Sequence, residues 1–218
     1  PCPGGNPMNA ISTSNDPIKN LLSQVPRRKP FAQLRASLVA LGIFTIICGG
    51  LYPLVVTGLA QVFFPYQANG SLVRDSAGQV RGSRLLAQDF AGAEWFQARP
   101  STIGYTAGAS GASNLAITSK ALAQAVAERR SAWMARFGQL AVPPDMLYAS
   151  GSGLDPEISR ESALAQLDAV AVARQLDDAT RQRLRELVET LSTKVLPGEA
   201  PRVNVVELNL ALLNGLQP

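Results

Sequence analysis

One apolar stretch, Leu38–Phe64, constrains this chain more than any other feature. No charged residue occurs between Arg35 and Arg74. Its most apolar part, Leu38–Leu59, has 22 residues, which at about 1.5 Å of rise per residue form a helix of about 33 Å, long enough to cross about 30 Å of hydrocarbon. Backbone polar groups in lipid must be satisfied within the segment itself. The stretch therefore predicts a single transmembrane helix, which we place at residues 36–64.

The charges beside this stretch predict its orientation. Residues 1–35 contain five basic residues and one acidic residue, and their net charge of +4 equals the formal charge of the whole chain. Because positively charged flanks stay in the cytoplasm, we expect residues 1–35 to be a cytoplasmic tail and residues 65–218 to be exported. The tail is rich in Pro, Asn, Ser and Gly, a composition typical of disorder. The pI near 9.4 thus reports topology, and no nucleic-acid partner is expected.

A cleavable signal peptide is the alternative interpretation of the apolar stretch. Gly58-Leu59-Ala60 has the small residues of a cleavage site. Signal peptides, however, have apolar regions of about 7–15 residues and a shorter charged region ahead of them. We therefore favour an uncleaved, single-pass anchor in the cell (inner) membrane.

Small residues recur every seven to eight positions within the predicted membrane helix. They would lie on roughly one face and let another helix approach closely. The alternative is that they face lipid with no partner. Proline lacks a backbone donor and is expected to kink the helix near its outer end. The candidate packing residues are Gly42, Gly49, Gly50, Pro53, Thr57 and Gly58.

Residues 65–218 predict one compact α+β domain in which helices outnumber strands. Turn residues separate two short alternating segments, and 3.6-residue periodicity with N-capping residues marks the helices. The expected elements are a hairpin of 72–74 and 79–81, a loop over 99–114, a helix after Ser119 that ends at Pro143-Pro144, a strand at Met146–Ala149, helices capped by Ser159 and Asp177, a strand at Arg202–Val206 and a helix at Glu207–Leu216.

Composition removes the commonest catalytic groups from this domain. The chain has no histidine, and its two cysteines, Cys2 and Cys48, precede residue 65. A Ser-His-Asp triad, a thiol nucleophile and a thiolate metal site are therefore excluded, and no Walker-type nucleotide motif occurs. Serines in Gly-rich loops leave an anchored hydrolase as an alternative, with Lys120 or Lys194 as its base. We expect an anchored accessory domain with no catalytic residues and no metal.

Several motifs follow one another along the chain, and together they resemble a known family. They are Phe64-Pro65-Tyr66-Gln67-Ala68-Asn69-Gly70-Ser71-Leu72, Gly82-Ser83, Gln88-Asp89-Phe90, Trp95-Phe96, Arg99-Pro100-Ser101, Ser110-Gly111-Ala112-Ser113-Asn114-Leu115, Ser150-Gly151-Ser152-Gly153-Leu154-Asp155-Pro156 and Arg202-Val203-Asn204-Val205-Val206-Glu207-Leu208-Asn209-Leu210. From about Leu38 to Leu213 the chain is similar to the KdpC family, the small subunit of the prokaryotic Kdp potassium-transporting ATPase.

The chain departs from the family's usual residues at four positions. Ala87 and Ala112 stand where glycine is usual, Glu157 where many relatives carry histidine, and Ala169 where arginine is common. These departures bear on the roles of single positions and leave the resemblance intact.

The resemblance implies a non-catalytic subunit of a complex that imports K⁺ at the expense of ATP. Its implied partners are a channel-like subunit that binds K⁺ and a P-type ATPase subunit, together with the lipid bilayer around its own membrane helix. The family is described as holding these two subunits together and as a catalytic chaperone that raises the pump's affinity for ATP. A stand-alone, membrane-anchored binding or scaffolding module is the alternative function.

ATP is the one cofactor that the resemblance implies, and we expect it to act through the complex rather than to bind this chain firmly. The charge asymmetry places the domain outside, away from cytoplasmic ATP. If nucleotide contacts this chain, Gly/Ser loops at 108–114 and 150–155 are the expected cradle, because their backbone N–H groups can face phosphates. The alternative is that both loops serve packing or subunit contacts. The candidate residues are Ser110, Gly111, Ser113, Asn114, Ser150, Gly151, Ser152 and Gly153.

Overall fold

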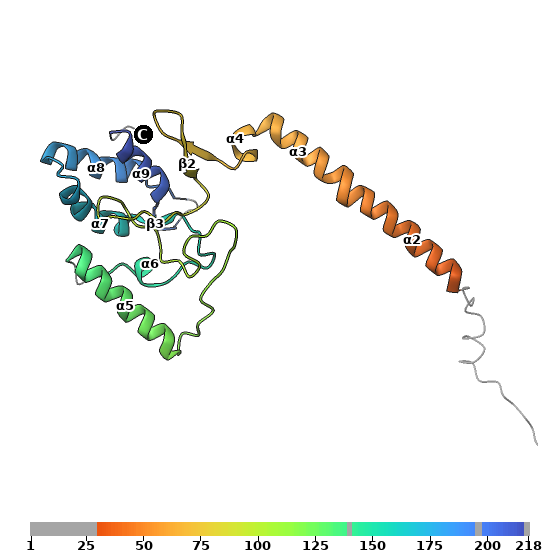
Figure 1. Ribbon diagram of the computed structural model, residues 1–218, viewed down its shortest axis with the longest axis horizontal. Helices are drawn as coiled ribbons and strands as arrows, with labels where there is room; N and C mark the ends of the chain where they lie inside the picture. Colours follow the sequence, from red (N-terminus) through yellow and green to blue (C-terminus); the bar gives the residue numbers. More distant parts are fainter. Residues whose placement is uncertain (1–29, 139–140, 195–197, 216–218) are drawn as a thin grey trace, which may run out of the picture. The chain divides into compact units, whose positions relative to one another are not determined.

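The computed structural model describes residues 30–138, 141–194 and 198–215. Contacts divide the chain into two units, Pro1–Leu59 and Ala60–Pro218, and each is described by itself. The expected tail lies outside the described residues as far as residue 29. The second unit contains both helices and strands (Figure 1), which confirms a mixed α+β chain.

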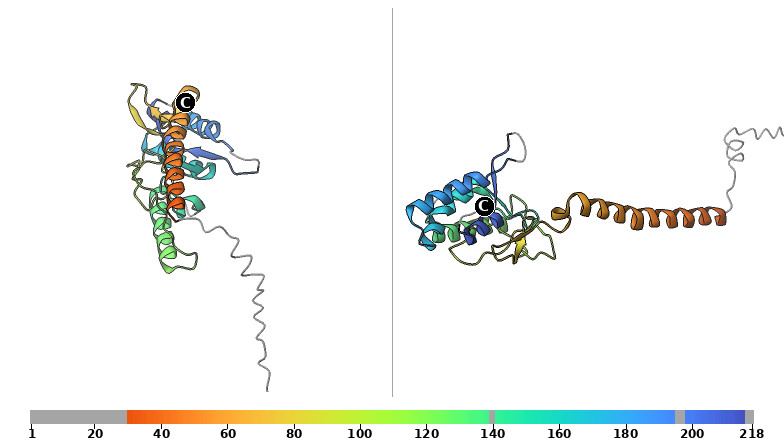
Figure 2. Two further views of the ribbon diagram at one scale, coloured as in Figure 1. Left: turned by 90° about the vertical axis from the view of Figure 1, so that its right-hand side faces the viewer. Right: turned by 90° about the horizontal axis from the view of Figure 1, so that it is seen from above.

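The apolar stretch is helical throughout. Helix α2 (Pro30–Ile46), the π-helical turn η1 (Ile47–Leu51) and helix α3 (Tyr52–Phe63) follow one another without a break (Figure 2). Among the described residues one helical segment, Gln33–Phe63, is long and apolar enough to cross a membrane, and its most apolar part is not buried against the rest of the chain. Helix α2 begins at Pro30, upstream of the expected boundary at residue 36.

A π-helical turn accommodates Pro53. Proline cannot donate to the carbonyl four residues before it, and its ring crowds that carbonyl. In the structure the preceding N–H, that of Tyr52, donates instead to the carbonyl of Ile47, five residues back. Since a π turn holds about one residue more than an α turn, residues after it are displaced by about 100° around the helix axis. Gly58, about 160° from Gly42 in a regular helix, therefore comes to within about 60° of it.

Two small antiparallel sheets organise the second unit. Strand β1 (Leu72–Arg74) pairs with β2 (Val80–Ser83), as the predicted hairpin requires, with a register shift at Val73/Arg74. Strand β3 (Glu157–Ser159) pairs with β4 (Arg202–Asn204). The helices of this unit are α4 (Pro65–Ala68), α5 (Lys120–Phe137), α6 (Pro144–Leu147), α7 (Arg160–Ala173), α8 (Asp178–Leu191) and α9 (Val205–Leu213).

Helices α7, α8 and α9 enclose the core together with β3 and β4 (Figure 1). The predicted N-caps of α7 and α8 are confirmed: the Ser159 hydroxyl accepts from the Ser162 N–H, and the Asp177 carboxylate accepts from the Thr180 N–H. Apolar residues at helical spacing then face inward. The largest fully buried apolar side chains are Phe96, Ile158, Leu167, Val170, Leu184, Val188, Val203, Val205 and Leu208.

Two expectations around residues 138–149 are wrong. Helix α5 ends before Pro143-Pro144, because Gly138 adopts φ 66° and its N–H donates to the Met134 carbonyl at 2.9 Å. Met146 and Leu147 of the expected strand Met146–Ala149 lie instead in the helical turn α6. Pro144 suits the first helical position of this turn, and the turn buries Met146 and Leu147.

The expected strand at Arg202–Val206 is confirmed only as far as Asn204. The Asn204 carboxamide oxygen accepts from the N–H groups of Val206 and Glu207, at 3.0 and 3.2 Å. A side chain that caps these donors starts a helix. Helix α9 therefore begins at Val205, two residues before the expected start at Glu207, and ends at Leu213.

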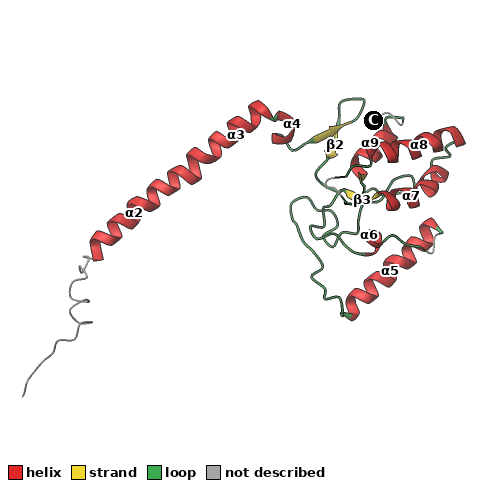
Figure 3. Cartoon of the chain, turned by 180° about the vertical axis from the view of Figure 1, so that it is seen from behind, coloured by secondary structure: helices red, strands yellow, loops and turns green. Residues whose placement is uncertain are grey.

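A long loop connects β2 to α5. Between Ser83 and Lys120 the chain forms no helix or strand (Figure 3), which confirms the predicted loop over 99–114. The loop nevertheless contributes Phe96 to the core, with none of its surface exposed. Side chains from α7 and α9 hold this part of the loop in place.

Candidate functional site

The two glycine- and serine-rich loops lie against each other. The Gly111 N–H donates to the Ser152 carbonyl at 2.9 Å, and the Ser110 hydroxyl donates to the same oxygen at 3.2 Å. The structure thus joins the two predicted loops, although no local pattern in either loop predicts this contact.

The segment after Arg99 ties both loops down. Ser101 donates its hydroxyl proton to the Gly153 carbonyl at 2.7 Å, and Thr102 donates to the Gly111 carbonyl at 3.1 Å. Gly153 adopts φ +71°, and a Cβ there would lie 2.6 Å from Ile103 Cγ1 and 2.9 Å from the Gly111 oxygen. Only glycine fits this position without strain.

The remaining predicted loop residues have mixed surroundings. Ser113, Asn114 and Gly151 are exposed, whereas Ser150 is buried and its N–H donates to the Pro100 carbonyl at 3.0 Å. The Ser152 hydroxyl accepts from the Leu154 N–H at 3.1 Å. Several polar groups of these loops therefore already form hydrogen bonds within the chain. Nucleotide binding by these loops stays a prediction.

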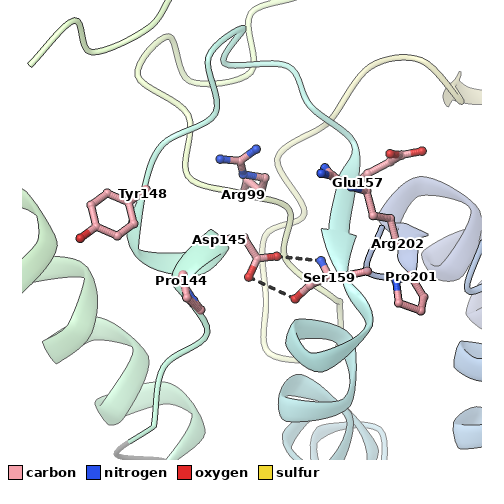
Figure 4. Close-up of a pocket in the computed structure, with 9 residues that line it drawn as sticks. Arg99, Pro144, Asp145, Tyr148, Glu157, Ser159, Pro201 and Arg202 are labelled. Atoms are coloured by element: carbon pink, nitrogen blue, oxygen red, sulfur yellow. Dashed lines mark hydrogen bonds between the residues drawn. The ribbon is translucent and has the colours of Figure 1, made fainter. Parts of the chain in front are cut away.

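A cavity of about 330 Å³ lies beside the loops, between α6, β3 and the start of β4. Figure 4 shows most of its lining, with Tyr148 and Arg202 on opposite sides of Asp145. Sequence reasoning missed this site because its residues come from four separate segments with no common periodicity. The lining residues are Arg99, Pro144, Asp145, Tyr148, Glu157, Ser159, Ala200, Pro201 and Arg202.

Arg99 is fixed by its neighbours in the loops. Its guanidinium forms an ion pair with Asp155 at 2.9 Å, with the two side chains 23% and 24% exposed. Its carbonyl accepts from the Tyr105 hydroxyl at 2.9 Å. Burial raises the pKa of Tyr105 above its usual value, and the Asp89 carboxylate adds to the shift, so Tyr105 remains a hydrogen-bond donor at neutral pH.

Asp145 joins α6 to the start of α7. Its carboxylate accepts from the Ser159 N–H at 2.7 Å and from the Ser159 hydroxyl at 3.2 Å (Figure 4). The Ser162 hydroxyl, which is fully buried, donates to the same carboxylate. With three donors, this carboxylate has a structural role. The chain has no histidine that could act as a base and activate Ser159 or Ser162 as a nucleophile.

Two buried side-chain amides pair with the backbone of the β2–α5 loop, as a neighbouring strand would in a sheet. Asn209 of α9 accepts from the Phe96 N–H and donates to the Phe96 carbonyl, both at 2.9 Å. Gln166 of α7 does the same for Gln97, at 2.7 and 3.1 Å. Both amides are completely buried. They satisfy backbone groups that would otherwise be costly to bury.

The predicted packing residues of the membrane helix face open space within the chain. A Cβ added at Gly42, Gly49, Gly50 or Gly58 would meet no atom within 4 Å. After the π turn, Thr57 and Gly58 lie nearer the Gly42 face than a regular helix would put them. Contact with a partner helix stays a prediction.

These features define a class of protein: a chain with one membrane-length apolar helix, followed by an α+β unit held together by buried amides and tightly tied Gly/Ser loops. The family described as "KdpC: K+-transporting ATPase, c chain" matches residues 34–214. The chain belongs to this family, which serves potassium transport.

The chain aligns with similar proteins over nearly the whole length of each of them. The chain is 50% identical over 181 residues to the "Potassium-transporting ATPase KdpC subunit" of Pseudomonas putida, covering 83% of this chain and 95% of that one. Proteins of the same name in Pseudomonas entomophila and Pseudomonas aeruginosa are 48% and 46% identical. They cover 83% and 84% of this chain, and 94% and 97% of their own length is matched.

Proposed function

We propose that this chain is the accessory, non-catalytic subunit of an ATP-driven potassium importer. It holds the K⁺-translocating and ATP-hydrolysing subunits together and raises the affinity of the pump subunit for ATP. The observation that carries the proposal is the family match, which spans both the apolar helix and the α+β unit. The exposed apolar helix and its small-residue face support the holding role, since such faces suit close helix packing.

The charge asymmetry supports an extracytoplasmic domain, which we place over the outer mouth of the K⁺-translocating subunit. All of the chain's net charge precedes the apolar helix, and such flanks stay inside. Protease added to intact spheroplasts is therefore expected to cut after Arg74 and to spare Arg27–Lys29. Immunoblotting with antibodies to each end reads the result. Cleavage of the domain only after lysis would reverse the orientation.

Assembly is the direct test of the proposed function. With this chain present, detergent extracts of K⁺-starved cells are expected to yield all subunits together and to hydrolyse ATP in response to K⁺. Without it, both the yield of complex and the K⁺-stimulated rate at low ATP are expected to fall by about tenfold or more.

Membrane-helix variants refine this test. Gly42→Leu places a large side chain on the small-residue face and is expected to lower the yield of complex, whereas Leu41→Phe, on a neighbouring face, is the matched control. Unchanged assembly and hydrolysis without the chain would refute the accessory role. The stand-alone alternative would then be favoured.

A further inference from the structure

Both arginines of the cavity beside the Gly/Ser loops already form ion pairs. Arg99 pairs with Asp155 at 2.9 Å, and Arg202 pairs with Glu199 at 3.1 Å. Opposite charges held at this distance largely cancel each other's field. The charge that an occupant of the cavity meets is therefore set by the two carboxylates of the lining, those of Asp145 and Glu157.

These two carboxylates differ in what they already bind. Asp145 is satisfied by the donors from Ser159 and Ser162. The Glu157 side chain forms no ion pair and no hydrogen bond within the part of the chain that the structure describes, although its residue is half-buried. A carboxylate on a half-buried residue gains more from an ion-pair partner than a fully exposed one does, because the surrounding protein screens the pair less than water. The cavity thus has one carboxylate without a partner, and the buried Arg99 Nε of its lining also lacks a hydrogen-bond partner.

The walls of the cavity are largely apolar. Pro144, Ala200, Pro201 and the ring of Tyr148 line it. A bare metal ion would need several converging oxygen ligands, and the described residues contain no group of three or more metal-ligating side chains. An arginine or lysine side chain meets both conditions, because its aliphatic stem packs on apolar walls while its head pairs with a carboxylate or lies over an aromatic ring.

We infer that this cavity receives an arginine or lysine side chain from another subunit of the same transporter, with Glu157 as its ion-pair partner. The inference rests on the proposed function, since it needs a neighbouring subunit. This contact would hold the α+β unit in the complex through β3 and α6, while the membrane helix forms a separate contact.

Glu157→Gln removes the charge and keeps the shape of the side chain. In the purified complex, immobilised through the ATPase subunit, this variant chain is expected to dissociate about tenfold faster than the wild type, because truncating a desolvated charge pair acts mainly on the dissociation rate. Glu186→Gln is the matched control: it makes the same change on α8, on an exposed residue outside the cavity, and should stay within about twofold. Thermal unfolding of each variant reports its folding.

A photo-cross-linking residue identifies the incoming side chain. With p-benzoylphenylalanine at Tyr148 and Glu157 intact, mass spectrometry of the irradiated complex is expected to find a peptide of another subunit that contains lysine or arginine. Replacing that basic residue by alanine should reproduce the Glu157→Gln rate, with no further effect in the double variant.

The outcomes separate the two proposals. Three results would overturn the cavity contact and leave the accessory role standing. They are a Glu157→Gln chain that dissociates at the wild-type rate, additive effects in the double variant, or a cross-linked peptide that contains no basic residue. A wild-type chain that never assembles with the other subunits would overturn the accessory role itself.

Discussion

Asn209→Leu is expected to lower the free energy of unfolding by about 3 kcal/mol. Leucine is close in size but cannot pair with the Phe96 N–H and carbonyl, both of which Asn209 satisfies at 2.9 Å. Each buried polar group left without a partner costs about 1–3 kcal/mol, and the amide is completely buried. Urea denaturation of the full chain in detergent, followed by tryptophan fluorescence, measures the change through Trp95 beside the affected segment.

Asn214→Leu provides the control for this experiment. Asn214 follows the end of α9 and accepts one exposed hydrogen bond, from the Ser76 N–H at 3.2 Å. The same substitution there is expected to cost less than about 1 kcal/mol. Equal unfolding midpoints for the two variants would show that the buried amide is not required for stability.

Gly153→Ala is expected to destabilise the chain by about 2–3 kcal/mol and to separate the Gly/Ser loops. The new Cβ would occupy a left-handed backbone position, which costs about 1–2 kcal/mol, and would lie 2.6 Å from Ile103 Cγ1. Gly151→Ala is the matched control two residues away, with no atom within 4 Å of its Cβ and no positive φ. Urea denaturation measures both variants.

Proteolysis gives a second readout of the same change. Separated loops should be cut faster in Gly153→Ala than in Gly151→Ala, because exposed loops are the preferred sites of cleavage. If both variants match the wild type in stability and in cleavage, the loops are not held together by the close approach at Gly153.

Local signals predicted much of the fold. The apolar stretch predicted the long helix, and the turn residues predicted the β1–β2 hairpin. Ser159 and Asp177 were identified as caps because their short acceptor side chains precede apolar stripes. These features depend on neighbours in sequence, and so the sequence alone can reveal them.

Where two local signals compete, sequence reasoning failed. Residues 202–206 alternate like a strand, yet Asn204 caps the next two N–H groups and turns the chain into α9. Pro143-Pro144 has the composition of a helix stop, but Gly138 had already ended α5 and Pro144 begins α6. In both places a side chain or a backbone angle, rather than the apolar pattern, decides the boundary.

The candidate sites depend on contacts between distant segments, which periodicity cannot predict. Asn209 and Gln166 are polar residues on buried helix faces, and each finds its partner in a loop more than sixty positions away. The cavity likewise needs Arg99, Glu157 and Arg202 from separate segments. Several of these residues lie in the motifs Arg99-Pro100, Asp155-Pro156 and Arg202–Asn209. Their occurrence in family motifs was the one feature of the sequence that pointed to these sites.

The buried amides of Asn209 and Gln166 have a consequence for the behaviour of this chain before assembly. A backbone segment paired by another strand would extend a sheet and leave a new free edge, which can recruit further chains into aggregates. A side-chain amide satisfies the same N–H and C=O groups and presents no such edge beyond it. The backbone of residues 96–97 is therefore tied to α7 and α9 by side-chain amides, which cannot template intermolecular β-pairing.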